Sequence, residues 1–192
     1  MNKIKVGFAI CGSFCTISKA IEQMKLLVNS GEYDVLPIMS TNAYSLDTRF
    51  GNAKDIVKEI ESICSKKVIH DLVSAEPIGP KNMVDIMLIA PCTGNTLSKL
   101  YRSIIDTPVT LAAKSHLRTQ KPLLIALATN DALGFSAKNI GCMLTEKNIY
   151  FVPMIQDDIE NKPNSLVADF DMIDICLKNA LNGNQIRPLV KK

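Results

Sequence analysis

Two kinds of apolar pattern alternate along this chain and predict strands and helices in turn. Short runs that are apolar almost throughout are typical of strands buried on both faces of a sheet, and we expect them at residues 5–10, 33–39, 67–71, 83–90, 123–128 and 148–152. Between these runs, apolar residues recur at the spacing of one helix face. This pattern predicts helices over residues 17–28, 53–64, 107–117, 137–144 and 166–181, with Ser136 and Ser165 capping the last two.

The regular alternation predicts a single α/β domain. Strands that alternate with helices form a parallel sheet with right-handed crossovers and with helices on both faces. The length of 192 residues suits one domain, and no internal repeat, low-complexity tract or linker divides the sequence. The expected domain spans residues 1–184, and the tail at residues 185–192 is expected to be loose.

Composition narrows the class of protein. The net charge is only +3 and the Lys and Arg residues are spread along the chain, so the sequence lacks the basic stripe of a nucleic-acid-binding protein. No apolar run approaches the ~20 residues that cross a bilayer, and the N-terminus leads directly into a strand rather than a signal peptide. We therefore expect a cytoplasmic protein whose six Cys residues are free thiols. Two isolated His residues, with no CxxC or HExxH motif, predict no metal site.

Small polar residues gather where the predicted strands end. They form four sets: Gly12-Ser13, Ser40-Thr41-Asn42, Thr93-Gly94-Asn95-Thr96 and Thr129-Asn130-Asp131. The carboxyl ends of parallel strands meet at one edge of a sheet, where the N–H groups of the following helices suit a phosphate. The pattern predicts a phosphate-bearing ligand, although the same residue types also serve as ordinary turn and capping residues. The sequence contains neither a P-loop nor a GxGxxG fingerprint.

Two of these sets resemble known motifs. The segment from Ala90 to Leu100, APCTGNTLSKL, is similar to the Pro-Ala-Ser-Ala-Asn-Thr signature of the homo-oligomeric flavin-containing cysteine decarboxylases. The segment from Ile10 to Phe14 resembles the Gly-Ser phosphate loop of the same family. The resemblance implies a flavodoxin-like (Rossmann-like) fold, FMN as cofactor and a trimer-based homo-oligomer. Gly94 stands where the signature has Ala, a change expected to matter little.

The flavin site of that family can be carried over residue by residue. The resemblance implies that Gly12, Ser13 and Phe14 bind the FMN phosphate. It places Ser40 and Thr41 beside the phosphate. It places the signature loop and the end of the following strand along the flavin, through Cys92, Thr93, Asn95, Thr96 and Thr129. We expect Cys92 to line the site rather than to act as a nucleophile, because no neighbouring His or Lys in the sequence would lower its pKa.

One departure from the family concerns its active-site His. The decarboxylases carry this residue shortly before the strand that leads into the signature loop, whereas residues 76–85 here contain no His. His70 lies too far upstream and is expected to have a structural role. The missing base argues against aminoenethiol-forming decarboxylation.

The C-terminal half carries a more specific resemblance. Residues 128–134, 137–141, 147–153, 156–158 and 162–169 resemble the B subunits of dipicolinate synthases, and the likeness extends over about residues 4–181. It implies a part in the oxidation of dihydrodipicolinate to the aromatic diacid in a sporulating bacterium, with NADP held by a separate A subunit. Asn130 and Asp131 are the candidate catalytic residues, and Asp131 would accept a proton from the substrate ring.

The residues leave three alternatives open. Asp131 would also serve to cap the helix that follows it. Separately, the absent His and the lack of a dinucleotide-binding motif allow the chain to be a non-catalytic partner of the A subunit that keeps the flavin fold. It would otherwise be an FMN-dependent decarboxylase of another substrate.

Overall fold

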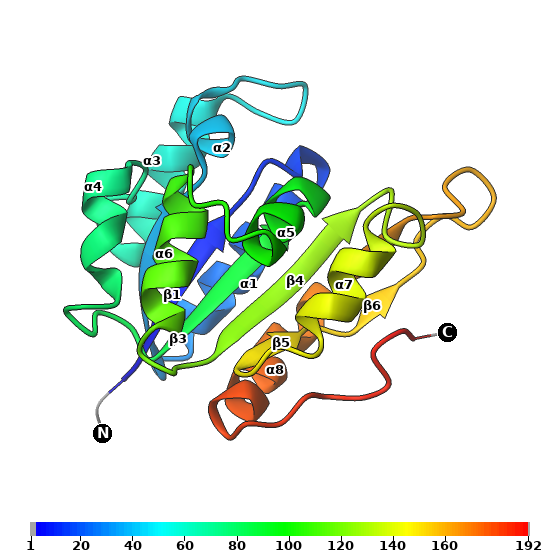
Figure 1. The fold of residues 1–192 in the computed structure, drawn as a ribbon. Coiled ribbons are helices and arrows are strands. Elements are labelled where there is room, and N and C mark those ends of the chain that lie inside the picture. Colours follow the sequence, from blue (N-terminus) through cyan, green and yellow to red (C-terminus); the bar gives the residue numbers. More distant parts are fainter. Residues whose placement is uncertain (1–2, 192) are drawn as a thin grey trace.

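A central sheet organises the fold (Figure 1). Residues 3–191, which the computed structural model describes, contain seven strands in the order β2-β1-β3-β4-β7-β6, with β5 paired to β4. The strands β1 to β5 pair in parallel, whereas β7 runs antiparallel to both β4 and β6. The strands are β1 Ile4–Ile10, β2 Tyr33–Met39, β3 Ile86–Cys92, β4 Leu123–Thr129, β5 Ile149–Phe151, β6 Met154–Ile155 and β7 Leu166–Ala168.

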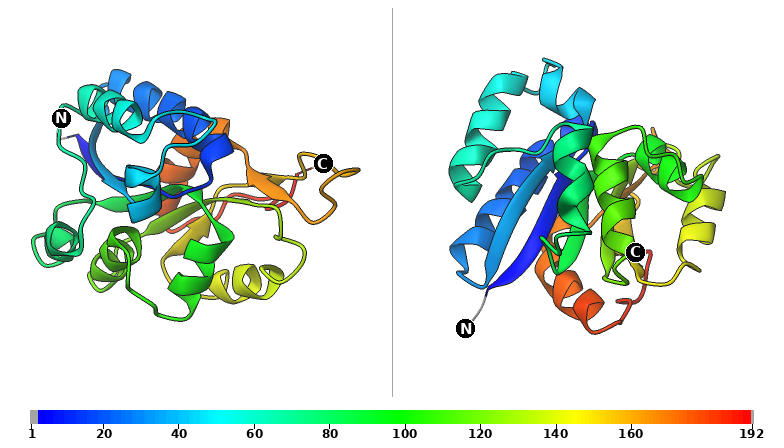
Figure 2. Two further views of the ribbon diagram at one scale, coloured as in Figure 1. Left: turned by 90° about the horizontal axis from the view of Figure 1, so that it is seen from above. Right: turned by 60° about the vertical axis from the view of Figure 1, so that its left-hand side comes forward.

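Two layers of helices cover the two faces of the sheet, as the view from above shows (Figure 2). One layer consists of α1 Ile17–Asn29, α3 Ala53–Cys64 and α8 Ile173–Leu181, and the other of α5 Gly94–Tyr101, α6 Pro108–Leu117 and α7 Ala137–Met143. The chain also forms two short helices, α2 Thr41–Ser45 and α4 Leu72–Ala75. It has three 3-10 turns, η1 Phe14–Thr16, η2 Glu76–Ile78 and η3 Phe170–Met172. Within residues 3–191, none of the helices combines the length and the apolar character that crossing a membrane requires.

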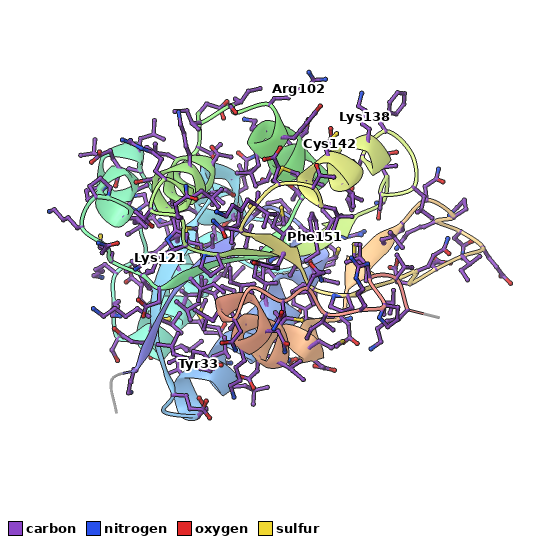
Figure 3. All side chains as sticks on the ribbon, turned by 60° about the horizontal axis from the view of Figure 1, so that its bottom comes forward. Tyr33, Arg102, Lys121, Lys138, Cys142 and Phe151 are labelled. Carbon is purple, nitrogen blue, oxygen red and sulfur yellow. The ribbon has the colours of Figure 1, made fainter. Side chains whose placement is uncertain are left out.

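Side chains fill the space between the sheet and each helix layer (Figure 3). Tyr33 packs in one apolar cluster and Phe151 in the other, and both are almost completely buried. All seven residues of β3 are buried, which is the pattern of a central strand with helices on both faces. The expected parallel α/β domain with helices on both faces is therefore confirmed.

The prediction of a strand at residues 67–71 is wrong. Within this stretch only Ile69 pairs with the sheet, as an isolated bridge to Ile38 of β2. The chain then turns at Asp71, whose Oδ1 accepts a hydrogen bond from Ser74 N at 2.8 Å and caps α4. Since the capping residue follows the bridge so closely, no longer ladder can form.

The closing helix begins later than expected. α8 starts at Ile173, and residues 166–168 form β7 instead. In β7 the half-buried Val167 separates two buried residues, which is the period-two alternation of a strand. Ser165 is buried and its hydroxyl donates to Asp157 Oδ1 at 2.8 Å, so Ser165 does not cap a helix.

The C-terminal segment is bound to the sheet rather than loose. Gln185 Oε1 accepts from Phe151 N at 2.8 Å, and its Nε2 donates to Phe151 O at 2.7 Å. Farther along, Met154 N donates to Leu189 O at 2.7 Å and Lys191 N to Met154 O at 2.8 Å. The boundary expected at residue 184 is therefore not the end of the ordered fold, because residues 185–191 satisfy backbone groups of β5 and β6. Residue 192 lies outside the described residues.

Candidate functional site

A cleft of about 470 Å³ lies at the carboxyl ends of the parallel strands. It is lined from three of the four predicted sets, by Gly12, Ser13, Phe14, Thr93, Thr129 and Asn130. The end of β1, the end of β3 and the end of β4 thus meet at a single hollow, where ligands of open parallel sheets bind.

The loop after β1 leaves space beside its glycine. Ser13 N donates to Cys11 O at 2.9 Å, and Thr16 N donates to Ser13 O at 3.0 Å, which leads the chain through η1 into α1. A Cβ added at Gly12 would lie 3.4 Å from the ring of Phe14, an ordinary contact. The fold itself therefore does not require glycine at this position.

The loop after β3 is fixed by its threonines. Thr93 Oγ1 accepts from Thr96 N at 3.1 Å and caps α5. A Cβ at Gly94 would lie only 2.8 Å from Thr129 Oγ1 and 3.0 Å from Ser136 Oγ. An alanine there would require these two hydroxyl groups to shift, so the expectation that the change at Gly94 matters little stays a prediction.

Two residues of the signature support this loop from behind instead of lining the cleft. Cys92 is fully buried and its thiol donates to Thr93 O at 3.6 Å. Burial, and then the neighbouring Cys11 thiol, raise the pKa of Cys92 well above its usual value, which rules out a thiolate nucleophile at neutral pH. Thr96 is also buried, and its hydroxyl donates to Cys11 Sγ at 3.3 Å.

Three further predicted residues lie on the surface around the cleft without lining it. Ser40 accepts a hydrogen bond from Ala43 N at 3.4 Å and caps α2. Thr41 and Asn95 are exposed in the first turns of α2 and α5. The place beside the phosphate inferred for Ser40 and Thr41, and the place along the flavin inferred for Asn95, therefore stay predictions.

The loop after β4 separates the two candidate catalytic residues. Asn130 is exposed and lines the cleft, whereas Asp131 is half-buried just behind it. Asp131 Oδ1 accepts from Phe135 N at 3.2 Å, and a Cβ at Gly134 would overlap this same oxygen. The bond from Phe135 N means that Asp131 closes the loop from residue 131 to residue 135. The N-cap residue of α7 is Ser136, whose side chain forms no capping hydrogen bond, so Asp131 does not cap this helix directly.

Further residues that were not predicted as site residues also line the cleft. They are Arg49, Phe50, Asp157, Lys162 and Val167. Arg49 and Phe50 lie between α2 and α3, and Lys162 lies in the loop between β6 and β7. The signals available in the sequence were an arginine next to an aromatic residue at positions 49 and 50, and the resemblance of residues 156–158 and 162–169, which by itself assigned no site residue.

The charges of the cleft favour an anion. Arg49 and Lys162 line it together with one carboxylate, that of Asp157. Lys162 Nζ is 3.9 Å from Asp157 Oδ2, a loose ion pair, and the other oxygen of Asp157 accepts from Ser165. One positive charge is therefore left over in the wall of the cleft.

His70 lies outside the cleft, in the structural role expected for it. Its ring stacks on Tyr44 with centroids 3.8 Å apart and an angle of 7° between the planes. Its Nδ1 lies 3.2 Å from Val68 O. Among residues 3–191, no three His, Cys, Asp or Glu side chains lie close enough together to hold a metal ion.

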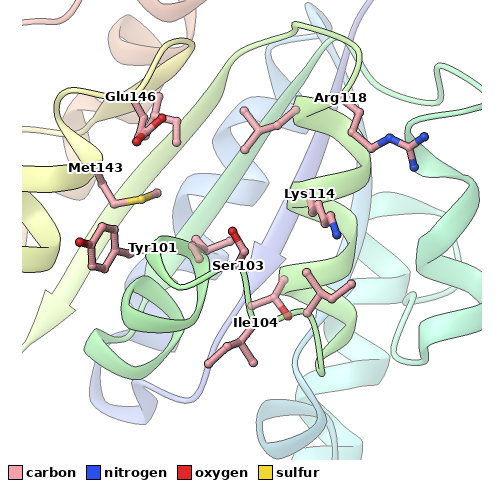
Figure 4. A pocket seen from close by; sticks show the side chains of 12 residues that line it. Tyr101, Ser103, Ile104, Lys114, Arg118, Met143 and Glu146 are labelled. Atoms are coloured by element: carbon pink, nitrogen blue, oxygen red, sulfur yellow. The ribbon is translucent and has the colours of Figure 1, made fainter.

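A second cavity, of about 370 Å³, lies between α5, α6 and α7 (Figure 4). Tyr101 and Ile104 come from the α5 side, Lys114 from α6, and Met143 and Glu146 from the α7 side. None of the predicted site residues lines it. Because it lies on a helix-covered face, away from the strand ends, we assign the candidate site to the cleft.

Known proteins share this architecture. The family model described as Flavoprotein matches residues 1–170, and the chain therefore belongs to the flavoprotein family. Among individual relatives, the B subunit of dipicolinate synthase of Bacillus subtilis (strain 168) is 41% identical over 186 residues, which are 97% of this chain and 92% of that protein.

Solved structures agree with the sequence match. The crystal structure of the dipicolinate synthase B subunit from Bacillus halodurans C has a TM-score of 0.90 and 39% identity, covering 100% of this chain and 99% of that one. The structure of AnUbiX (PadA1) in complex with FMN and dimethylallyl pyrophosphate has a TM-score of 0.61 and 16% identity, covering 79% and 78% of the two chains. The first match confirms the resemblance and the flavodoxin-like fold, and the second shares the fold.

Proposed function

We propose that this chain is the flavoprotein-type B subunit of a dipicolinate synthase and contributes to the oxidation of dihydrodipicolinate during bacterial sporulation. The observation that carries the proposal is the 41% identity to the Bacillus subtilis protein over 97% of the chain. In the reaction the ring loses two electrons and two protons: a hydride equivalent passes to NADP on a separate A subunit, and one proton goes to a base.

FMN is the proposed cofactor of the cleft. The flavoprotein family and the FMN complex of AnUbiX support this choice. The residues fit the cofactor, since the loop at Gly12 and Ser13 can approach a phosphate closely while Thr93 and Thr129 line the remaining cleft. FMN supplies two-electron redox chemistry when it is bound. A trimer-based homo-oligomer is part of the proposal.

The diacid is proposed to lie at the end of the cleft near β4 and β7. There Lys162 offers a positive charge for a carboxylate, and Asn130 offers an amide for the ring nitrogen or a second carboxylate. Asp131 follows directly and is the proposed acceptor of the ring proton.

Replacing Gly12 by Val is expected to raise the dissociation constant for FMN at least tenfold, or about 1.4 kcal/mol. The added side chain enters the space in which the phosphate would approach the backbone, while the fold tolerates a Cβ at this position. Flavin absorbance or fluorescence titrations measure the effect. Gly141→Val is the matched control, because a Cβ at Gly141 meets no atom within 4 Å and Gly141 lies outside the cleft. Unchanged FMN affinity in a folded Gly12→Val protein would remove the phosphate from this loop.

Reconstitution with the A subunit tests the function as a whole. The purified chain, loaded with FMN and mixed with the A subunit and NADP, is expected to form dipicolinate from dihydrodipicolinate faster than the A subunit alone. The same rate with and without FMN would assign this chain a non-catalytic role beside its partner. No acceleration by either form would contradict the proposal.

The purified protein is expected to release no carbon dioxide from cysteine-ended peptides or phosphopantothenoylcysteine. The stretch at residues 76–85, where the decarboxylases carry their His, has none, and His70 is stacked on Tyr44 away from the cleft. A carbon dioxide assay with FMN-loaded protein checks this. Turnover above ~0.1 per second, against ~1–1000 per second for ordinary enzymes, would overturn it.

A further inference from the structure

A tight turn at residues 48–51 forms one rim of the cleft. Thr48 N donates to Gly51 O at 3.0 Å, and Gly51 N donates to Thr48 O at 3.1 Å. Phe50 N also donates to Thr48 Oγ1 at 3.2 Å. These bonds hold the backbone of the turn, so its two central residues, Arg49 and Phe50, are presented to the cleft from a fixed position.

Arg49 carries a charge that no carboxylate among residues 3–191 balances, because it forms no ion pair with any of them. Its guanidinium carbon lies 4.8 Å from the centre of the Phe50 ring, and Phe50 is 51% exposed although it is aromatic. Stacking on the ring orients the planar guanidinium and leaves its N–H groups free for an anion.

The turn belongs to the end of the cleft near β1 and β2. Phe50 and Phe14 line both the cleft and a groove beside α1, which places the turn next to η1. The second cation, Lys162, comes from the loop between β6 and β7, at the other side of the sheet order. Arg49 therefore reaches the cleft from the β2 side of the loop at Ser13, whereas Lys162 reaches it from the β7 side and also lines a groove with Cys15 and Thr16.

We propose that Arg49 binds the phosphate of the flavin through its guanidinium and thereby makes the cleft select FMN over riboflavin. The inference rests on the proposed FMN site. The donors of the loop at Gly12 and Ser13 are uncharged, whereas a phosphate monoester carries nearly two negative charges at pH 7. A guanidinium pairs with a phosphate through two parallel charge-assisted hydrogen bonds, and Phe50 keeps it in the required orientation. Riboflavin, which has the same ring and ribityl chain but no phosphate, gains nothing from Arg49.

Parallel titrations of the flavin-free protein with FMN and with riboflavin test the assignment. The wild-type protein is expected to bind FMN at least about tenfold more tightly than riboflavin. Arg49→Gln should remove most of this preference, weakening FMN about tenfold or more while leaving the riboflavin affinity within about twofold. Arg49→Lys should keep part of the preference, because it retains the charge but not the fork of donors. The salt dependence of FMN binding should flatten in Arg49→Gln.

Arg102→Gln is the matched control. Its guanidinium carbon also lies over an aromatic ring, 5.1 Å from the centre of Tyr101, but Arg102 is exposed at the surface and does not line the cleft (Figure 3). An equal loss of FMN and riboflavin in Arg49→Gln would show a structural role and overturn the assignment. Unchanged FMN affinity would overturn it as well, as would a loss confined to dipicolinate binding. If the wild-type protein binds neither flavin, the proposed FMN site itself is wrong. This result differs from FMN binding that is unchanged by the substitution of Arg49, which would overturn only the role of Arg49.

Discussion

Replacing Gly79 by Ala is expected to lower the free energy of unfolding by about 3 kcal/mol or more. Gly79 ends η2, where Gly79 N donates to Ser115 Oγ at 3.0 Å and Ser115 Oγ donates to Glu76 O at 2.7 Å. A Cβ at Gly79 would overlap the backbone carbonyl of Ser115 in α6 and lie 2.7 Å from its Oγ. Backbone cannot move aside as a side chain tip can, so the added methyl would push η2 away from α6 and break both hydrogen bonds.

Urea denaturation of the two proteins measures this change directly. Gly141→Ala is the control, because Gly141 lies within α7 and a Cβ there meets no atom within 4 Å. It should stabilise the protein by about 0.5–1 kcal/mol, since alanine is the better helix former and restricts the unfolded chain. A Gly79→Ala protein as stable as the wild type would show that η2 is not packed against α6 as described.

The parallel core of the fold was predictable because its strands are buried on both faces. β3 and β4 read as continuous apolar runs, and the helices between them carry apolar residues on one face. The prediction failed where a short element is held by tertiary contacts. Residues 166–168 alternate too briefly to be distinguished from the start of a helix, and their pairing with β4 and β6 decides their structure.

The candidate site was predictable in part for a similar reason. Residues at strand ends are brought together by the sheet, so Ser13, Thr93 and Asn130 could be grouped from the order of elements alone. Arg49 and Lys162 belong to loops between other elements, and nothing local in the sequence directs those loops toward the cleft. Cys92 is the opposite case: it belongs to the signature motif, but its side chain is buried in the core and does not line the cleft.

Asp131 combines two features that can be separated by mutation. One carboxylate oxygen accepts from Phe135 N at 3.2 Å and closes the loop after β4. The residue also directly follows Asn130, which lines the cleft where we propose that the diacid binds. An asparagine keeps a carbonyl oxygen for the bond from Phe135 N but cannot accept a proton, whereas an alanine loses both functions.

Asp131→Asn is expected to reduce dipicolinate formation by the reconstituted enzyme about a hundredfold or more, with a nearly unchanged melting temperature. A positioned general base contributes about 10²–10⁴-fold, and its loss should lower the rate without affecting FMN binding. Asp131→Ala should show the same loss of rate and in addition cost about 0.5–2 kcal/mol of stability, as the loss of a capping-type hydrogen bond does. Assays of both variants together with the A subunit, alongside thermal melts and FMN titrations, measure the two effects separately. Full synthase activity in a stable Asp131→Asn protein would limit the role of Asp131 to closing the loop, because asparagine can neither take up the proton nor supply the negative charge of the carboxylate.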